Sequence, residues 1–544
     1  MNGNVIPLED FPQINADNGE SNPTPTWTIN GCCSKKGIGE LPQMSTIQSQ
    51  AVLQNAIDGW NNGQGTWTQM SLKDRITHIR KFITELMNRR EEIIRVLMWE
   101  IGKNYPDAKS EFDRTITFIE KSIEAIESLS SEEYNPSSTF TKIGSTNVFK
   151  RRNGFGIILC LGPYNYPLNE TYATMIPALL MGNILILKIP QVGGLSHLLS
   201  FEAFAKALPP NTVHFISGSG RKTLPPLMTS GKIDGLAFIG GTNAADLLIK
   251  QHPEPHRLKI FLQLEAKNMA IVLNDLCERH ENDDNDSEGY NLSKAVDDII
   301  TGSLSYNGQR CTALKIIYAP RGSGSLVSKM IADRVNNMNI GFPWDAFDGG
   351  YSQITPLPNE GRIKYMKELM EDAIDKGASV VNENGGTIVS SDDHQVYSKE
   401  TLMIPAVLFP ITSEMKIFKE EQFGPLIPVV EYDSLDEVLQ YGSEGIYGQQ
   451  VSIFTHDDSK SASTLIDGFS SIFGKINVNS QCGRSPDNVP FTARRSSGMG
   501  VMSIEDALKE FSVPTVVSFK EGKDEKIVET MANIQKKSVF MADL

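Results

Sequence analysis

The sequence predicts an α/β protein, because strand-length apolar runs alternate with helical patterns along most of the chain. Residues 157–161 and 184–187 are short apolar runs, and further runs of this kind occupy 213–216 and 235–239. Turn residues and helical patterns separate them. This spacing is typical of βαβ units on a parallel sheet. A second α/β block is expected from 296 to 501.

Helical patterns precede the first block. Apolar residues recur at three- and four-residue intervals from 72 to 86, which predicts an amphipathic helix. This pattern is expected to continue, after a break, into 93–101, and a further helix is expected over 106–129. Prolines, glycines and asparagines indicate an irregular arm over 1–44, and the acidic stretch 278–288 is expected to be an exposed loop.

Composition narrows the class of protein. The 544 residues are enough for two or three domains, and there is no run of about 18 apolar residues that could span a membrane. The net charge of −15 disfavours nucleic acid and anionic membranes as partners, since both bind cationic surfaces. The six cysteines lack the spacings of a zinc site. We expect a reducing compartment and, without a secretory signal pattern, a cytoplasmic location.

Cys311 is the first candidate for chemistry. It lies in the segment Gly-Gln-Arg-Cys-Thr at 308–312, directly after Arg310. A thiol attacks as its thiolate, and a neighbouring cation lowers the pKa of the thiol, so Arg310 is expected to activate Cys311. Its guanidinium can also hold a phosphate or carboxylate. The alternative is a small buried hydrophobe, but the polar residues before Cys311 are poor core material. The segment indicates covalent chemistry on an anionic substrate.

Two glycine-containing turns are candidates for binding phosphate. Gly218 begins a Gly-Ser-Gly turn, and Gly240, Gly241 and Thr242 form a second one. Each follows a predicted strand, where backbone amides and a helix N-terminus can hold an anion. Neither is a complete Gly-x-Gly-x-x-Gly motif, and either one alone is more often a simple turn.

Three motifs carry a resemblance to a known family. They are Pro-Tyr-Asn-Tyr-Pro at 163–167, Gly-Gln-Arg-Cys-Thr at 308–312 and Glu-Gln-Phe-Gly-Pro at 421–425. Their order and separations resemble those of the aldehyde dehydrogenase superfamily over about residues 45–520. Within it, the chain is most similar to the non-phosphorylating glyceraldehyde-3-phosphate dehydrogenases, as the Ile-Thr-Pro-Leu segment at 354–357 also indicates.

The resemblance implies a covalent mechanism. The Cys311 thiolate would add to an aldehyde, and Asn165 would donate its side-chain amide to the resulting oxyanion together with a backbone N–H. Hydride would then pass to a nicotinamide, which leaves a thioester for water to hydrolyse. The resemblance also assigns the binding of a substrate phosphate to a set of cationic and phenolic side chains. These are Arg114, Tyr166, Arg310 and Arg484.

The resemblance also implies a dinucleotide cofactor. Lys188 matches the family's lysine that contacts the adenosine ribose. Glu421 matches the glutamate that holds the nicotinamide ribose, and Phe423 would pack near the ring. NAD-preferring relatives commonly carry a glutamate shortly after the lysine, but the residues here are Gln-Val-Gly-Gly at 191–194. NADP is therefore favoured, and NAD is possible.

One position departs from the family pattern. The family's deacylation glutamate opens a Glu-Leu-Gly-Gly-Lys segment, but this chain has Gln-Leu-Glu-Ala-Lys, with Gln263 at the first position. A glutamine cannot take a proton from water. Glu265, two residues on, is expected to serve as a displaced general base. Alternatively, another group or another nucleophile completes the reaction.

The family's architecture would combine a Rossmann-like cofactor domain, an α/β catalytic domain and a small β oligomerisation arm. The expected bounds are 45–290 for the cofactor domain, with an oligomerisation segment near 140–152, 291–505 for the catalytic domain, and 506–544 for the C-terminal strand and tail. Alternating apolar residues at 513–519 are expected to pair with the sheet edge of another chain. The family is dimeric or tetrameric, so a homo-oligomer is expected.

Three functions stay open from the sequence. The first is NADP-dependent oxidation of glyceraldehyde 3-phosphate, a small phosphorylated aldehyde, to 3-phosphoglycerate without inorganic phosphate. The second is another aldehyde or semialdehyde dehydrogenase, including one that transfers the acyl group to coenzyme A, for which a missing base at Gln263 would be natural. The third is a catalytically weak relative kept as a structural subunit.

Overall fold

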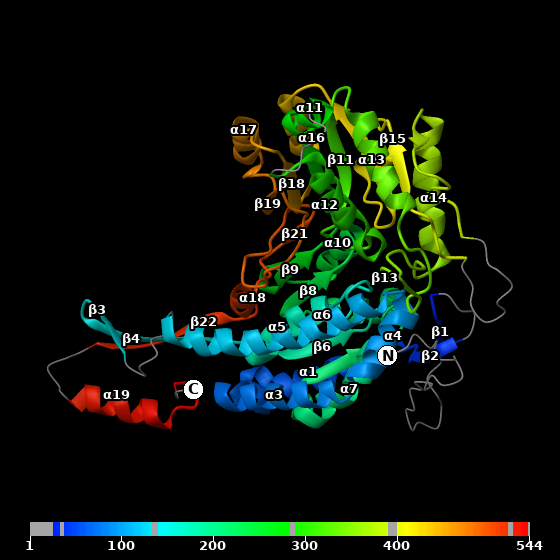
Figure 1. Cartoon of the computed structure of the whole chain (residues 1–544). Helices are drawn as coiled ribbons and strands as arrows, with labels where there is room; N and C mark the ends of the chain where they lie inside the picture. Colours follow the sequence, from blue (N-terminus) through cyan, green and yellow to red (C-terminus); the bar gives the residue numbers. More distant parts are fainter. Residues whose placement is uncertain are drawn as a thin grey trace.

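The computed structural model describes residues 26–32, 37–132, 140–282, 289–389, 400–520 and 526–541. They form two α/β units and an extended β arm (Figure 1). Part of the predicted irregular arm is a hairpin of β1 (Thr26–Asn30) and β2 (Gly37–Pro42). Ile38 and Leu41 of β2 are buried in the core of the first unit, which explains why this segment is ordered into strands. Residues 1–25 lie outside the described residues.

The predicted helices over 72–129 are confirmed. They are α3 (Leu72–Met87), α4 (Arg90–Ile101) and α5 (Tyr105–Glu132), and α1 (Thr46–Trp60) precedes them. Ser71 begins α3 by accepting a hydrogen bond from the backbone N–H of Asp74, as an N-cap does. These helices pack beside the first sheet (Figure 1).

The first sheet has the Rossmann-like topology that the alternation of strands and helices along the sequence predicts. Its order is β21-β9-β8-β5-β6-β7, and all pairs are parallel except that of β21 with β9. The strands are β5 (Ile157–Leu161), β6 (Ile184–Lys188), β7 (Val213–Ile216), β8 (Gly235–Ile239), β9 (Lys259–Gln263) and β21 (Gly498–Met499). The connecting helices are α6 (Asn169–Leu180), α7 (Leu195–Ala207), α8 (Gly220–Thr223), α9 (Pro225–Met228) and α10 (Thr242–Gln251). The strand order reverses between β5 and β8, the position where such sheets bind ligands.

The second sheet is also mostly parallel, in the order β14-β15-β16-β11-β10-β18-β19. Its strands are β10 (Asn268–Val272), β11 (Leu314–Pro320), β14 (Ser379–Val380), β15 (Ala406–Phe409), β16 (Leu426–Tyr432), β18 (Gln450–Phe454) and β19 (Lys475–Val478). The main helices on it are α12 (Leu292–Leu304), α13 (Gly324–Asn336), α14 (Glu360–Asp375), α16 (Leu435–Glu444) and α17 (Ser459–Phe469). Two apolar clusters fill the two faces of this sheet.

The chain passes between the units earlier than the predicted boundary at 290. β9 ends the first unit's parallel series at Gln263, and β10, which begins at Asn268, already belongs to the second sheet. The helix α11 (Asn274–Asn282) follows β10, and residues 283–288 of the predicted acidic loop lie outside the described residues. Local patterns cannot show which of two sheets a strand joins, because that is decided by partners far away in the sequence.

The arm joins two segments that the sequence singled out. β22 (Val513–Lys520) pairs antiparallel with β4 (Thr146–Asn153), which also pairs with β3 (Thr141–Ile143). The helices α18 (Ile504–Glu510) and α19 (Lys526–Lys537) flank β22 along the chain. The strand therefore pairs within its own chain, and the role of the arm in oligomerisation stays a prediction.

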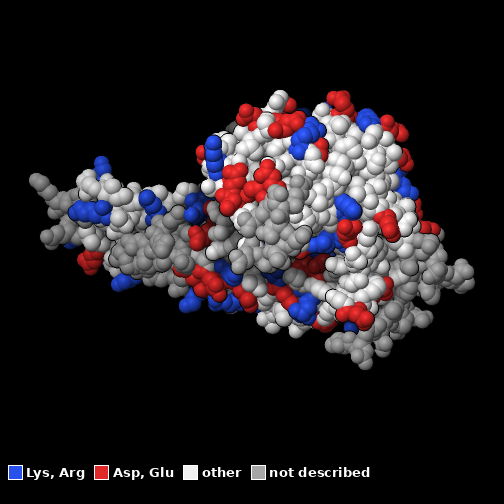
Figure 2. Space-filling view, turned by 45° about the horizontal axis from the view of Figure 1, so that its top comes forward, with Lys and Arg blue, Asp and Glu red and all other residues white. Residues whose placement is uncertain are grey.

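Two surface properties are simple. Acidic and basic side chains are intermingled over the face that Figure 2 shows, rather than gathered by sign. Among the described residues, no helix is both long enough and apolar enough to cross a membrane.

Candidate active site

A cavity of about 1080 Å³ lies where the first sheet faces the second unit. The residues that follow β5, β6, β8 and β9 line it from the first unit, at the carboxyl ends of the parallel strands. Most of the predicted site residues gather in its wall. They are Arg114, Asn165, Tyr166, Gly240, Gly241, Glu265, Arg310, Cys311, Glu421, Phe423 and Arg484. Lys188, Gly218 and Thr242 are not among the lining residues.

Cys311 follows a turn with unusual backbone geometry. Tyr306, Asn307 and Gly308 have φ values of 50°, 56° and 70°, so three consecutive residues adopt the left-handed region. The Asn307 side chain stabilises the turn, donating to the carbonyl of Thr355 at 3.0 Å and accepting from its N–H at 2.9 Å. A Cβ at Gly308 would lie 2.7 Å from the carbonyl oxygen of Gly424. Backbone strain of this kind marks functional sites.

Two asparagines hold the segment that carries the thiol. Asn268, in the first position of β10, donates to the carbonyl of Cys311 at 2.7 Å and to that of Ala313 at 2.9 Å. Asn165 donates to the carbonyl of Gln309 at 2.7 Å. An amide nitrogen has two hydrogens, so Asn165 keeps one N–H for a ligand in the cavity that it lines. This geometry is compatible with the predicted oxyanion role.

The electrostatic surroundings of Cys311 differ from the expectation. Burial raises the pKa of the Cys311 thiol to about 12, and the carboxylates of Glu170 and Glu421 act in the same direction. The predicted lowering of this pKa by Arg310 is not found; the cation that lowers it is Lys315. The guanidinium of Arg310 donates instead to the carbonyl of Cys482 at 3.4 Å. Adjacent residues point their side chains in different directions, so a sequence neighbour need not be an electrostatic neighbour.

Glu421 and Phe423 lie on a loop that buried cations support. Glu421 accepts from the N–H of Ala266 at 3.2 Å, and its carboxylate lies 3.5 Å from Nζ of Lys315. The same Nζ lies 4.6 Å from the centre of the Phe423 ring. Lys267 is buried behind the loop and donates to the carbonyl of Glu420 at 2.7 Å. These contacts fix both predicted cofactor residues against the cavity.

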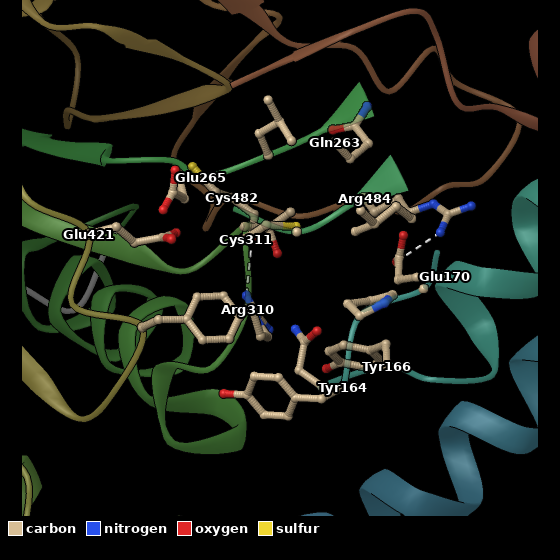
Figure 3. Close-up of a pocket in the computed structure, with 18 of the residues that line it drawn as sticks. Tyr164, Tyr166, Glu170, Gln263, Glu265, Arg310, Cys311, Glu421, Cys482 and Arg484 are labelled. Atoms are coloured by element: carbon tan, nitrogen blue, oxygen red, sulfur yellow. Dashed lines mark hydrogen bonds and ion pairs between the residues drawn. The ribbon is translucent and has the colours of Figure 1, made fainter. Parts of the chain in front are cut away.

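The predicted phosphate-binding end contains carboxylates as well as arginines. Arg114 holds Asp487 through two hydrogen bonds of 3.2 and 2.7 Å. Arg484 lies 2.8 Å from a carboxylate oxygen of Glu170 and 3.5 Å from one of Asp487 (Figure 3). Tyr166 lies beside them in the cavity wall. Sequence reasoning missed Glu170, because an acid in the first turn of a helix is usually explained by the helix dipole.

The two positions considered for a deacylation base have different surroundings. Gln263 is 2% exposed and lines the cavity, and neither of its side-chain amide atoms has a hydrogen-bond partner among the described residues. Glu265 accepts from the backbone N–H of Thr242 at 3.0 Å and from its hydroxyl at 2.6 Å. Its carboxylate therefore caps α10. Its role as general base stays a prediction.

The remaining cofactor candidates lie at the edge of the site. The Lys188 ammonium donates to the carbonyl of Ile189 at 2.6 Å, and burial lowers the pKa of this lysine to about 8. Gly218 has a φ of 96°, and a Cβ there would lie 2.9 Å from the backbone nitrogen of Met44. Its conformation is thus explained by close packing, and its contact with a cofactor stays a prediction, as does that of Lys188.

The wall of the cavity fits a dinucleotide. Gly240 and Gly241 line it directly before the N-terminus of α10, a helix end that favours anions and that the Glu265 carboxylate occupies in this structure. Gln191 and Val192 line the cavity after β6, so no carboxylate stands at these two positions to repel a 2′-phosphate. Among the described residues, no cluster of side chains could hold a metal ion.

Comparison with known proteins establishes the class. Residues 26–517 match the aldehyde dehydrogenase family, and the chain belongs to this family. The resemblance in the three motifs and the predicted fold class are thereby confirmed.

Individual relatives are more distant. An NADP-dependent glyceraldehyde-3-phosphate dehydrogenase of Streptococcus equinus is 29% identical over 477 residues, which is 87% of this chain and 91% of that protein. The enzyme of the same name from Pisum sativum is 27% identical over 464 residues, 85% of this chain and 86% of that protein. The crystal structure of NADP-dependent glyceraldehyde-3-phosphate dehydrogenase from Bacillus halodurans C-125, complexed with NADP, superposes with a TM-score of 0.76 at 24% identity. The superposition covers 92% of this chain and 96% of the crystallised chain, and it shows that the two chains share a fold.

Proposed function

We propose that this aldehyde dehydrogenase oxidises glyceraldehyde 3-phosphate to 3-phosphoglycerate with NADP, through a thioester on Cys311 and without inorganic phosphate. The observation that carries the proposal is the cavity itself. It brings the thiol of Cys311 together with Asn165 and with three arginines, Arg114, Arg310 and Arg484. Relatives named NADP-dependent glyceraldehyde-3-phosphate dehydrogenase, at 26–29% identity, support it.

The residues divide the reaction between them. The Cys311 thiolate attacks the aldehyde carbon, and the free N–H of Asn165 donates to the oxyanion that forms. The arginines and Tyr166 hold the phosphate, which places the aldehyde carbon over the sulfur. Bound NADP supplies the hydride acceptor. The product of this half-reaction is an acyl group joined to Cys311.

The cofactor assignment uses residues of both units. Gly240, Gly241 and Thr242 would receive the phosphates, and Glu421 and Phe423 would hold the nicotinamide ribose and ring. Lys188 would contact the adenosine ribose. NADP is favoured because no acid follows Lys188 at 191–194, and NAD stays possible. The thiol with a pKa near 12 has to ionise before it reacts, so the bound complex must favour the thiolate more than the free protein does.

A substrate panel tests this function. Wild-type protein is mixed with NADP or NAD and with glyceraldehyde 3-phosphate or glyceraldehyde, and reduced cofactor is followed by stopped flow. We expect a stoichiometric burst that Cys311→Ser abolishes. Arg114→Gln and Arg484→Gln should raise KM for the phosphorylated aldehyde by about 10- to 100-fold, as expected for a lost charge-assisted bond, and change KM for glyceraldehyde little. Equal use of both aldehydes by the wild type would contradict the proposal.

One observation favours a second function, acyl transfer to a thiol such as coenzyme A. Gln263 cannot activate water, and Glu265 is engaged by Thr242. If water is a poor acceptor here, an external thiol would complete the reaction. Coenzyme A added to the steady-state assay would then raise the rate and yield an acyl-coenzyme A product, whereas a hydrolase would release the free acid at the same rate with or without it.

A further inference from the structure

Hydrolysis of a thioester needs a group that takes a proton from water. The cavity offers three carboxylates, those of Glu170, Glu265 and Glu421. They differ in how firmly other groups hold them, and this difference identifies the one that is available for proton transfer.

Two of the three carboxylates are held by the fold. Glu265 receives two hydrogen bonds from Thr242 at the N-terminus of α10. Glu421 receives the N–H of Ala266 and the charge of Lys315. Figure 3 shows both on one side of Cys311 in that view, whereas Gln263 and Glu170 lie on the other side. In that view Glu170 therefore lies on the side of the position that carries the base in the family pattern.

Glu170 is placed at the rim of the cavity by α6. It lies in the first turn of this helix, three residues after Pro167, and its side chain is 15% exposed. Its negative charge reaches Cys311, since it contributes to the raised pKa of that thiol. The chain thus lacks a carboxylate at Gln263 and has one at Glu170 that acts on the same sulfur.

Glu170 forms an ion pair with Arg484, and a substrate can take the place of Glu170 in that pair. Nη1 of Arg484 lies 2.8 Å from the carboxylate, but none of the three guanidinium nitrogens makes a hydrogen bond of good geometry to any described residue. The Arg484 side chain is 5% exposed and faces the cavity. A substrate phosphate would offer this guanidinium better acceptors, and Glu170 would then lose its counter-ion.

We propose that Glu170 is the general base that hydrolyses the Cys311 thioester, and that binding of the substrate phosphate to Arg484 releases it for this step. The inference rests on the proposed function. The Glu170 carboxylate takes a proton from water as the water oxygen bonds to the thioester carbonyl carbon. The carbon–sulfur bond then breaks, the thiolate of Cys311 leaves, and the carboxylic acid is released.

The test compares Glu170→Gln with Glu265→Gln, the same substitution at the alternative base. Each variant is mixed with NADP and glyceraldehyde 3-phosphate, and the burst and the steady-state rate are measured separately. We expect Glu170→Gln to keep a full burst, which also shows that it is folded, and to lose at least 100-fold in steady-state rate. The acyl adduct should then accumulate on Cys311 and be seen by mass spectrometry.

Two additions separate a catalytic role from a structural one. Hydroxylamine attacks a thioester without a protein base, so it should restore turnover of Glu170→Gln. A second substitution, Gln263→Glu, should restore hydrolysis in the same background, because it returns a carboxylate to the position that carries the base in the family pattern. A merely structural loss at Glu170 would respond to neither.

The outcomes are distinct. A wild-type steady-state rate in Glu170→Gln, or a loss of hydrolysis confined to Glu265→Gln, overturns the inference. Absence of a burst from the wild type with glyceraldehyde 3-phosphate would instead contradict the proposed function. In that case the comparison of the two variants is made with glyceraldehyde and added inorganic phosphate, which can occupy Arg484 in place of the substrate phosphate, and a steady-state loss confined to Glu170→Gln still supports Glu170 as the base.

Discussion

Asn268 is predicted to position Cys311, the proposed nucleophile, and the structure allows the effect of removing Asn268 to be worked out. Its side chain makes three hydrogen bonds to backbone groups, donating to the carbonyls of Cys311 and Ala313 and accepting from the N–H of Gln450 at 3.0 Å. At roughly 1 kcal/mol each, Asn268→Ala removes about 3 kcal/mol. Two of the three bonds hold the segment of Cys311, so that segment should shift.

A matched variant separates stability from positioning. Asn382 is also buried and also holds backbone, donating to the carbonyl of Pro405 at 2.8 Å and accepting from the N–H of Val407 at 2.9 Å, but neither of these groups belongs to the segment of Cys311. Both Asn268→Ala and Asn382→Ala should lower the melting temperature. Only Asn268→Ala should slow the burst, by on the order of 100-fold for a displacement of about 1 Å.

The assay is the single-turnover formation of reduced cofactor at a temperature where both variants are folded. Burst rates are compared at saturating aldehyde, so that weaker binding does not contribute. If the burst rate of Asn268→Ala equals that of Asn382→Ala, the side chain contributes stability alone and the positioning argument is refuted.

Three further predictions follow from single contacts. Because the pKa of the Cys311 thiol in the protein without ligands is about 12, its thiolate fraction should rise about tenfold per pH unit from pH 6 to pH 10. The rate of its alkylation by iodoacetamide, measured by mass spectrometry of the modified peptide, should rise in the same way. A rate that reaches a plateau below pH 9 would contradict this. Gly308→Ala should cost about 1–3 kcal/mol and abolish the burst, because a Cβ would meet the carbonyl of Gly424 in a left-handed conformation; normal activity would show that the turn can relax. Lys103→Met leaves the buried Glu111 without its cation and should destabilise the protein by about 3–5 kcal/mol, measured by denaturant unfolding; the double variant with Glu111→Gln should recover part of that loss.

Local patterns in the sequence were sufficient to predict many of the elements and to mark Cys311 as a candidate nucleophile. The three- and four-residue spacing of apolar residues identified α3, and the short apolar runs identified β5 and β6. Both signals depend only on neighbours along the chain, as does the polar segment around Cys311. The motif around Asn165 likewise identified a residue that contacts the segment just before Cys311.

The tertiary structure decided what these residues face. Glu170 and Arg484 form an ion pair across the two units, and Glu265 caps α10 although it follows β9. The pKa of Cys311 is raised by burial and by carboxylates from distant segments, against the expectation based on its neighbour Arg310. Desolvation and Coulomb interactions depend on distance in space and on the loss of water, and neither quantity can be obtained from the order of residues along the chain.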